Sequence, residues 1–450
     1  MSSHLPYDLI QSLAHVKGFD KEAFESVHAS GEQVTSIRIN PAKPATQLLP
    51  ANAKSPIPWT QYGFYLQQRP SFTFDPLFHA GCYYVQEASS MFLEQALRQT
   101  VDLSQPLKVL DLSAAPGGKS THIQSLITDD SLLVSNEVIR SRAGILKDNI
   151  VKWGSSNVMV TNNDPKDFAR LPGYFDVIVV DAPCSGSGLF RRDPEAIEEW
   201  SFHNVQLCSQ RQQRILADVW PALKENGVLI YSTCSYSREE DEFIVNWMAA
   251  ESKVEKLRLL TDSDWNIVES EGGYRFWPDR LKGEGFFIAC FRKNDGQAEV
   301  NERIKKKPEV LTKKELEVVG KWAHTDAVHF IKNQQTVYGW PGKLENDFSF
   351  LLNQLRVLYS GTIIGELMRE KLVPDHALAM SNLLRDTIER TALDYENAIQ
   401  YLRRKDIKIE TTTKGWQGVT YEGQLLGWIN VLPNRINNYY PKELRILKEN

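Results

Sequence analysis

Two cysteines of this 450-residue chain each follow a run of residues that is typical of a buried β-strand. Cys184 lies in residues 175–188 (FDVIVVDAPCSGSG), where a β-branched run ends in Asp181. Cys234 lies in residues 231–235 (YSTCS), directly after the apolar run 228–231. Such runs suit strands of a parallel sheet that are buried on both faces, and ligands bind just past the carboxyl ends of these strands. If the two strands are neighbours, both thiols and the carboxylate face one crevice.

Two thiols beside an acid suit one reaction in particular, the methylation of a pyrimidine at carbon 5. That carbon is a poor nucleophile, but addition of a thiolate at carbon 6 makes it enamine-like and able to attack an electrophilic methyl group. Asp181 would hydrogen-bond the ring as charge builds there, and a base would then remove the proton from carbon 5. The alternative is a strand and turn with buried cysteines, because free cysteine is often buried. Two cysteines past strand ends beside an acid favour the chemical interpretation.

A glycine-rich turn at residues 111–119 (DLSAAPGGK) follows another predicted strand. Glycines there let backbone approach a ligand closely, at the start of a helix. The spacing is neither GxGxxG nor that of a P-loop, which disfavours a dinucleotide or a nucleoside triphosphate. Two later strands end near acids, with Glu137 placed to hold a ribose diol and Asp164 placed to meet an adenine amino group. These observations predict an adenosine-like cofactor.

Residues 105–293 alternate strand and helix patterns, which indicates βαβ units on a parallel sheet and an α/β, Rossmann-like fold. Strands are predicted at 107–112, 132–135, 158–161, 175–181, 228–231 and, as a late edge strand, 285–292. Helices are predicted from the glycine turn to residue 126 and at 140–153, 205–223 and 239–250. Residues 1–100 are predicted to form a small α+β unit with an extended segment at 36–40 and a proline-rich loop at 44–58. The C-terminal third is predicted to form one or two α+β modules, with strands at 336–338 and 427–431 and helices at 374–384 and 394–403.

The bulk composition is that of an ordinary globular protein, with 42% hydrophobic and 24% charged residues. Five scattered cysteines without metal-ligand spacing argue against a disulfide framework and against a metal site. The sequence shows no membrane span and no signal pattern, so a reduced cytoplasmic setting is expected. The net charge of −5 is mildly unfavourable for nucleic acid, although local basic patches matter more than the total.

The motifs DLSAAPGGKS, DAPCSGSG and YSTCS resemble those of the Nol1/Nop2/Sun family of RNA cytosine-5 methyltransferases, which use S-adenosylmethionine. The segments RRDPEAIEEW, GEGFFIACFRK and SIRINP also fit, and residues 415–447 resemble the PUA-like tail of RsmF-type 16S rRNA enzymes. The resemblance implies a class I methyltransferase domain at 101–293. It also implies an N-terminal module of RNA-binding type at 1–100, a linker at 294–310 and a PUA-like RNA-binding region at 311–450.

The resemblance also implies roles for individual residues. Cys234 is the implied nucleophile and Cys184 is implied to help release the product, with Asp181 and Lys119 completing the catalytic set. The implied cofactor-binding residues are Ser113, Ala114, Ala115, Pro116, Gly117, Gly118, Lys119, Glu137, Arg142, Asp164 and Asp181. Ser113 replaces a common cysteine and Glu137 replaces a common aspartate, and both changes preserve size or charge.

Structured RNA, most specifically the rRNA of the small ribosomal subunit, is the expected partner of a monomeric protein. Extruding one cytidine costs a few kcal/mol, which phosphate and shape contacts must supply. Basic and aromatic residues predicted to make such contacts are Arg191, Arg192, Arg435, Tyr439 and Tyr440. Two alternatives stay open: the same chemistry on tRNA or 23S rRNA, and a non-catalytic RNA-binding assembly factor that keeps the fold as a scaffold.

Overall fold

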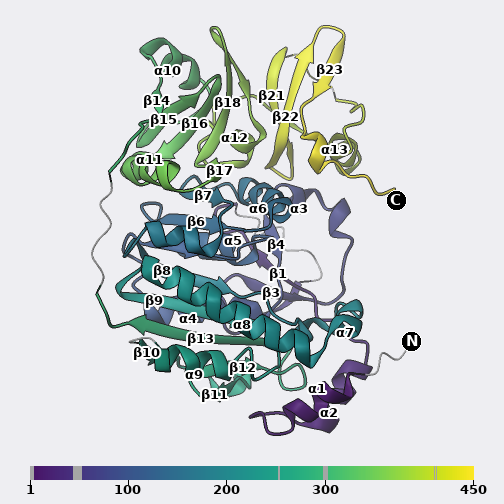
Figure 1. The fold of residues 1–450 in the computed structure, drawn as a ribbon. Coiled ribbons are helices and arrows are strands. Elements are labelled where there is room, and N and C mark those ends of the chain that lie inside the picture. Colours follow the sequence, from purple (N-terminus) through teal and green to yellow (C-terminus); the bar gives the residue numbers. More distant parts are fainter. Residues whose placement is uncertain are drawn as a thin grey trace.

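The computed structural model describes residues 5–43, 53–251, 254–296, 303–409, 411 and 413–449. Its largest feature is a ten-stranded sheet with the order β11-β12-β13-β9-β8-β5-β6-β7-β17, in which β10 also pairs with β13 (Figure 1). The central strands β9, β8, β5, β6 and β7 are parallel. The order places β5 and β8 side by side where the winding reverses, the usual position of a ligand crevice.

The strands of the large sheet agree closely with the α/β prediction. They are β5 (Lys108–Asp111), β6 (Leu132–Asn136), β7 (Val158–Thr161), β8 (Phe175–Asp181), β9 (Leu223–Thr233), β10 (Val254–Leu257), β11 (Val268–Ser270), β12 (Gly273–Phe276), β13 (Phe286–Lys293) and β17 (Val357–Ser360). The run in β8 alternates between two cores, because Val177 and Val179 pack on one face while Ile178 and Val180 pack on the other. The prediction of a strand buried on both faces is confirmed.

Helices cover both faces of this sheet (Figure 1). They are α4 (Leu93–Thr100), α5 (Gly118–Gln124), α6 (Arg140–Trp153), α8 (Phe202–Val219) and α9 (Glu242–Glu251), whereas the short α7 (Glu195–Glu199) packs against a separate core that includes Phe190 and Trp200. Apolar residues of α8 and α9 join one core, and those of α4, α5 and α6 join the other. Within the described ranges, no helix combines the length and apolar character that crossing a membrane requires.

The prediction of an edge strand at 285–292 is wrong. The strand exists as β13, but it lies inside the sheet, antiparallel to β9 on one side and to β12 on the other. The residues of β13 are almost all buried, which suits an interior strand. Its apolar run alone did not reveal that the short hairpin β11–β12 would extend the sheet beyond it.

The N-terminal residues split between two places. Strands β1 (Ser36–Ile39), β2 (Ala53–Pro56), β3 (Gly63–Leu66) and β4 (Tyr83–Val85) form an antiparallel sheet in the order β2-β3-β1-β4. Helices α1 (Tyr7–Leu13) and α2 (Lys21–Ala29) lie apart from it (Figure 1) and share a core with Tyr236 and Trp277. The predicted loop at 44–58 is partly wrong, because β2 lies in it; residues 44–52 are outside the described residues.

The C-terminal region adds two further sheets and several short helices. One sheet contains β14 (Glu309–Val310), β15 (Val328–Asn333), β16 (Thr336–Pro341), β18 (Thr362–Met368) and β19 (Lys371–Pro374), and the other contains β20 (Arg390–Ala392), β21 (Gly415–Tyr421), β22 (Gln424–Leu432) and β23 (Arg435–Asn438). Their helices are α10 (Lys313–Val319), α11 (Glu345–Gln354), α12 (His376–Met380) and α13 (Tyr395–Leu402), and short α3 (Pro76–His79) belongs to the N-terminal part. The edge strand β17 comes from this region but pairs antiparallel with β7 of the large sheet.

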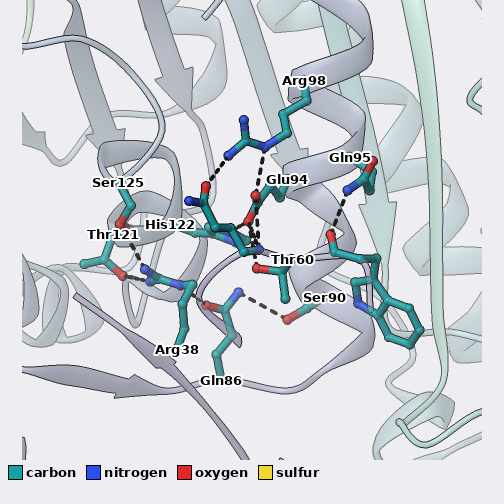
Figure 2. A network of polar contacts seen from close by, with 12 residues as sticks. Arg38, Thr60, Gln86, Ser90, Glu94, Gln95, Arg98, Thr121, His122 and Ser125 are labelled. Carbon is teal, nitrogen blue, oxygen red and sulfur yellow. Dashed lines mark hydrogen bonds and ion pairs between the residues drawn. The ribbon is translucent and has the colours of Figure 1, made fainter. Parts of the chain in front are cut away.

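Arg38 of β1 ties the N-terminal sheet to helix α5, which begins in the glycine-rich turn. Figure 2 shows its guanidinium among Gln86, Thr121 and Ser125. It donates to Gln86 Oε1 at 2.8 Å, to Thr121 Oγ1 at 2.6 Å, and to the carbonyl of Gly118 at 3.2 Å. Arg38 is fully buried, so each of these bonds offsets the cost of removing the charge from water.

The variant R38K tests this connection. A lysine cannot reproduce the planar fork of donors, so several acceptors around helix α5 lose their partners. We expect the free energy of unfolding to fall by about 2–4 kcal/mol, the range for breaking a buried polar network. Urea titration measures the change, and R258K, at a solvent-exposed ion pair with Glu269, is the control that stays near zero. An equal loss in both variants would contradict the assignment.

Candidate functional site

The two cysteines predicted to share a crevice lie in contact. Strands β8 and β9 pair in parallel with Asp181 opposite Ser232, so the chain leaves both strands at the same edge. Beyond these ends, the Sγ atoms of Cys184 and Cys234 are 3.1 Å apart, and both residues are partly exposed. Cys82, Cys208 and Cys290 are buried.

The hydrogen bond with Cys234, together with burial, raises the pKa of the Cys184 thiol well above its ordinary value. Cys184 therefore stays protonated near neutral pH and can donate its S–H to the sulfur of Cys234. A donated proton stabilises negative charge on the accepting sulfur, and the thiolate is the nucleophilic form of cysteine. Spacing in the sequence could not show this contact between the two sulfurs.

Asp181 and Lys119 form an ion pair beside the thiols, with Lys119 Nζ 2.8 Å from Asp181 Oδ2. The hydroxyl of Ser232 donates to Asp181 Oδ1 at 2.8 Å, so both carboxylate oxygens are oriented. Burial alone would lower the pKa of Lys119, but the charge and hydrogen bond of Asp181 raise it, and the amine stays charged. The Asp181 side chain is 37% exposed and therefore remains open to a ligand in the crevice.

The glycine-rich turn lies at the carboxyl end of β5. Gly117 has a φ of 115°, a conformation that side chains rarely adopt, and helix α5 starts at the next residue. Arg142 Nη2 donates to the carbonyl of Ala115 at 2.8 Å, and Asn149 donates to the carbonyl of Pro116 at 2.8 Å. Helix α6 therefore holds the turn from outside. Of the remaining predicted residues, Ser113 and Gly118 are half-buried and Ala114 is buried.

The two other strand-end acids lie where they were predicted. Glu137 is buried and accepts the backbone N–H of Ile139 at 2.9 Å through Oε1, while Arg142 Nη1 lies 3.7 Å from Oε2. Asp164 is half-buried and caps the short helix Pro165–Arg170. Burial raises the pKa of Asp111 to about 7, against the hydrogen bond from Ser120, and its Oδ1 has no hydrogen-bond partner among the described residues. No group of three metal-ligating side chains occurs in the part of the chain that the structure describes.

Asn136 is a structural member of this edge that the sequence did not single out. Its amide donates to the carbonyls of Leu112 and Asn163, and its Oδ1 accepts from Thr161 Oγ1 at 2.9 Å. It thus joins the ends of β5, β6 and β7. The signal in the sequence that could have identified Asn136 is its position directly before Glu137, at the end of the same strand.

The predicted RNA contact of Arg191 requires correction. Its side chain is 5% exposed, and it donates to the carbonyls of Gly283 and Glu32. Nη1 also lies 3.5 Å from Glu284 Oε2. This arginine is occupied in joining the segment after Cys184 to its neighbours. Arg192, next to it, is exposed.

The predicted RNA contact of Tyr440 also requires correction. Its side chain is 2% exposed, packs edge-on against His376 and lies near Tyr401. Arg435 is exposed and Tyr439 is 40% exposed, with the Tyr439 ring 4.3 Å from that of Trp416. Strand β23 and the turn after it therefore place adjacent tyrosines on opposite sides of the backbone.

Glu284 predicts a specific pH dependence of stability. Burial raises its pKa to about 7, against the charge of Arg191. The folded state thus holds a proton that the unfolded state releases near pH 4.5, so stability falls as pH rises from 4.5 to 7. We expect E284Q to lack the loss of stability that deprotonation of Glu284 causes. The free energy of unfolding of E284Q minus that of wild type should therefore rise by about 1–3 kcal/mol between pH 4.5 and pH 8.

Urea titrations of both proteins at pH 4.5 and pH 8 measure this difference. The variant E269Q, at an exposed ion pair, serves as the control with little pH-dependent change. A constant difference between E284Q and wild type across this range would refute the raised pKa.

Comparison with known proteins covers nearly the whole chain. Residues 5–88 match the N-terminal domain of 16S rRNA methyltransferase RsmF, 99–292 match the 16S rRNA methyltransferase RsmB/F model, and 389–446 match the methyltransferase RsmF PUA domain. Curated relatives include the ribosomal RNA small subunit methyltransferase F of Aliivibrio salmonicida, 31% identical over 91% of this chain and 90% of the relative. That of Shewanella loihica is 30% identical over 91% and 88%.

Solved structures give the same fold. A methyltransferase homolog from Pyrococcus horikoshii is 27% identical, with a TM-score of 0.52 over 64% of this chain and 100% of its own. NSun6 from the same organism, solved with SFG, is 20% identical, with a TM-score of 0.54 over 64% of this chain and 98% of its own. The second likeness is one of fold alone.

Proposed function

This chain belongs to the RsmF family of ribosomal RNA small subunit methyltransferases, and we propose that it methylates carbon 5 of a cytosine in 16S rRNA. The single observation that carries the choice of atom is the contact between Cys184 and Cys234 at the strand ends, 3.1 Å between sulfurs. Methylation of an exocyclic amine needs no covalent intermediate and would leave both thiols idle. Methylation of carbon 5 needs one thiol that adds to carbon 6. A second thiol assists by returning a proton to the sulfur that leaves.

In the proposed reaction, Cys234 Sγ adds to carbon 6 of the cytosine and forms a carbon–sulfur bond. The electron pair moves toward carbon 5 and ring nitrogen 3, while Asp181 orients the base by accepting a hydrogen bond from its exocyclic amine. After carbon 5 has gained the methyl group, it loses its proton to a base, the electron pair re-forms the ring double bond, and the bond to Sγ breaks. Cys184, protonated and in contact with Cys234, assists this release by returning a proton to the departing sulfur.

S-adenosylmethionine is the cofactor that the family implies, and it supplies an electrophilic methyl group when bound. The residues present fit an adenosine, because the left-handed Gly117 leads from the turn into helix α5 and two carboxylates follow the neighbouring strands. Ser113 to Lys119 would lie along it, and Glu137 and Asp164 would hold its ribose and base. Arg142 would hold the turn through Ala115, and the Lys119–Asp181 pair would border the methyl end.

The C-terminal module supports RNA binding through a groove of about 450 Å³ beside β23, lined by residues that include Arg404, Lys405, Asn437 and Tyr439. Basic and aromatic groups together suit phosphates and unstacked bases. We include Arg435, Tyr439 and Arg192, which follows Cys184 by eight residues, among the proposed RNA contacts. All three are exposed.

The variant C234A tests the nucleophile. Removal of the sulfur prevents addition to carbon 6, so methyl transfer should fall by at least about 1,000-fold while S-adenosylmethionine still binds. Bisulfite sequencing of total RNA from a strain carrying only this variant should show loss of a 5-methylcytosine in 16S rRNA. Retained methylation would refute the nucleophile, and loss from tRNA or 23S rRNA alone would refute the substrate.

The variant C184A tests the release step. Without its proton donor, Cys234 should leave carbon 6 slowly, and a covalent protein–RNA adduct should accumulate. Denaturing gel electrophoresis with labelled RNA and S-adenosylmethionine detects this adduct as a slow-migrating band. The double variant C184A/C234A is the matched control and should show none. Turnover by C184A at the wild-type rate without an adduct would contradict the role of Cys184.

A further inference from the structure

A buried carboxylate, Glu240, lies between the two loops that carry the cysteines. Glu240 is 0% exposed, and its Oε2 accepts the hydroxyls of Ser185 and Ser235, each at 2.6 Å. These serines directly follow Cys184 and Cys234 in the chain. One oxygen atom therefore joins the residues next to both thiols.

The second oxygen of Glu240 strengthens the link to the Cys184 loop. Oε1 accepts the backbone N–H of Ser185 at 2.8 Å and the side-chain amide of Gln212 at 3.3 Å. The same Gln212 nitrogen donates to the carbonyl of Pro183 at 3.0 Å. The residues on both sides of Cys184 are thus held by Glu240 and by a side chain of helix α8 that Glu240 contacts.

Glu240 is itself held by strand β9. The hydroxyl of Tyr231 donates to the backbone carbonyl of Glu240 at 2.6 Å, and Tyr231 is fully buried. The two loops also bond to one another directly, because the N–H of Gly188 donates to the carbonyl of Cys234 and the N–H of Tyr236 donates to Ser187 Oγ, each at 2.9 Å. The carboxylate is the member of this arrangement that reaches both serine hydroxyls.

Burying a carboxylate costs free energy that its hydrogen bonds must offset. Burial raises the pKa of Glu240, while the bonds from Ser185 and Ser235 lower it. Three of its four donor bonds come from the two serines, so the charge is stabilised chiefly by the loops that carry the thiols. The free-energy cost of burying this carboxylate is best explained by the hydrogen bonds with which it fixes the two loops.

We propose that Glu240 is a positioning residue for methyl transfer: it ties the Cys184 loop to the Cys234 loop and sets the spacing of the two sulfurs. The inference rests on the proposed cysteine chemistry and adds to it a residue outside the motifs DAPCSGSG and YSTCS. Its negative charge also opposes ionisation of Cys184, after the larger effects of Cys234 and burial. Glu240 thereby helps to keep Cys184 as the proton donor of the pair.

The test uses the full-length variants E240A and E240Q, with E242Q as matched control. Glu242 lies two residues away and is as buried, but its carboxylate pairs with Arg275 at 2.5 and 2.6 Å. Phenylarsine oxide probes the spacing without RNA or cofactor, since tight binding needs two thiols on one arsenic atom. Iodoacetamide alkylation of Cys184, followed by peptide mass spectrometry from pH 6 to 10, probes its ionisation.

We expect the affinity of E240A for phenylarsine oxide to fall at least tenfold and its kcat for methyl transfer to fall about 100-fold, with KM for RNA within threefold of wild type. In E240Q, the pH midpoint of Cys184 alkylation should move to lower pH, because the nearby negative charge is gone. E242Q should keep the wild-type arsenical affinity, alkylation midpoint and kcat per folded molecule. The double variant S185A/S235A, which removes both hydroxyl donors, should reproduce the E240A result and serves if E240A does not fold.

Unchanged arsenical affinity and kcat in E240A, or the same losses in E242Q, would overturn the positioning role. An alkylation midpoint in E240Q at or above that of wild type would overturn the effect of the charge. The arsenical result does not depend on methyl transfer. Weakened arsenical binding in E240A together with full turnover by C234A would therefore reject the proposed reaction and retain the positioning role. Inactive C234A together with fully active E240A would retain the proposed reaction and reject the positioning role.

Discussion

The parallel pairing of β8 with β9 is the constraint on which the site depends. Neighbouring strands lie about 4.8 Å apart, so side chains from adjacent strand ends can touch, whereas those from strands farther apart cannot. Here the register sets Asp181 opposite Ser232, and the two loops that follow bring their sulfurs to 3.1 Å. The Ser232 hydroxyl then orients the carboxylate to which Lys119 pairs. Any shift of this register would move Cys234 and Ser232 away from both Cys184 and Asp181.

The flanking regions hold the same edge of the sheet from outside. Arg38 reaches from the N-terminal sheet to helix α5, and β17 extends the sheet from the C-terminal region. The backbone next to β17 also reaches the cofactor side, because Asn163 exchanges hydrogen bonds with Arg356, while the adjacent Asn162 donates to the carbonyl of Glu137. The C-terminal region is therefore attached to the sheet by backbone pairing, as well as through the chain that connects the two.

Much of the central fold could be predicted because its signals are local. The β-branched run of β8 and the helix at 140–153 appear in the structure at the expected residues. Burial of Arg191 and Tyr440 could not be predicted, because a basic or aromatic residue in a polar segment resembles an exposed one until its neighbours are known. Glu240 was missed for the same reason, since nothing near it in the sequence marks it as a partner of Ser185 and Ser235.

The sequence by itself determined which residues end the strands, and so which chemistry the crevice can hold: Asp181, the two cysteines and the glycine-rich turn. Strand periodicity and turn residues are properties of short segments, and they act before the chain is folded. Only the tertiary structure decided which strands are neighbours, how close the two sulfurs lie and which carboxylate joins the loops. These depend on burial and on contacts between residues some 50 positions apart, such as Ser185 and Glu240, which exist only once the sheet has formed.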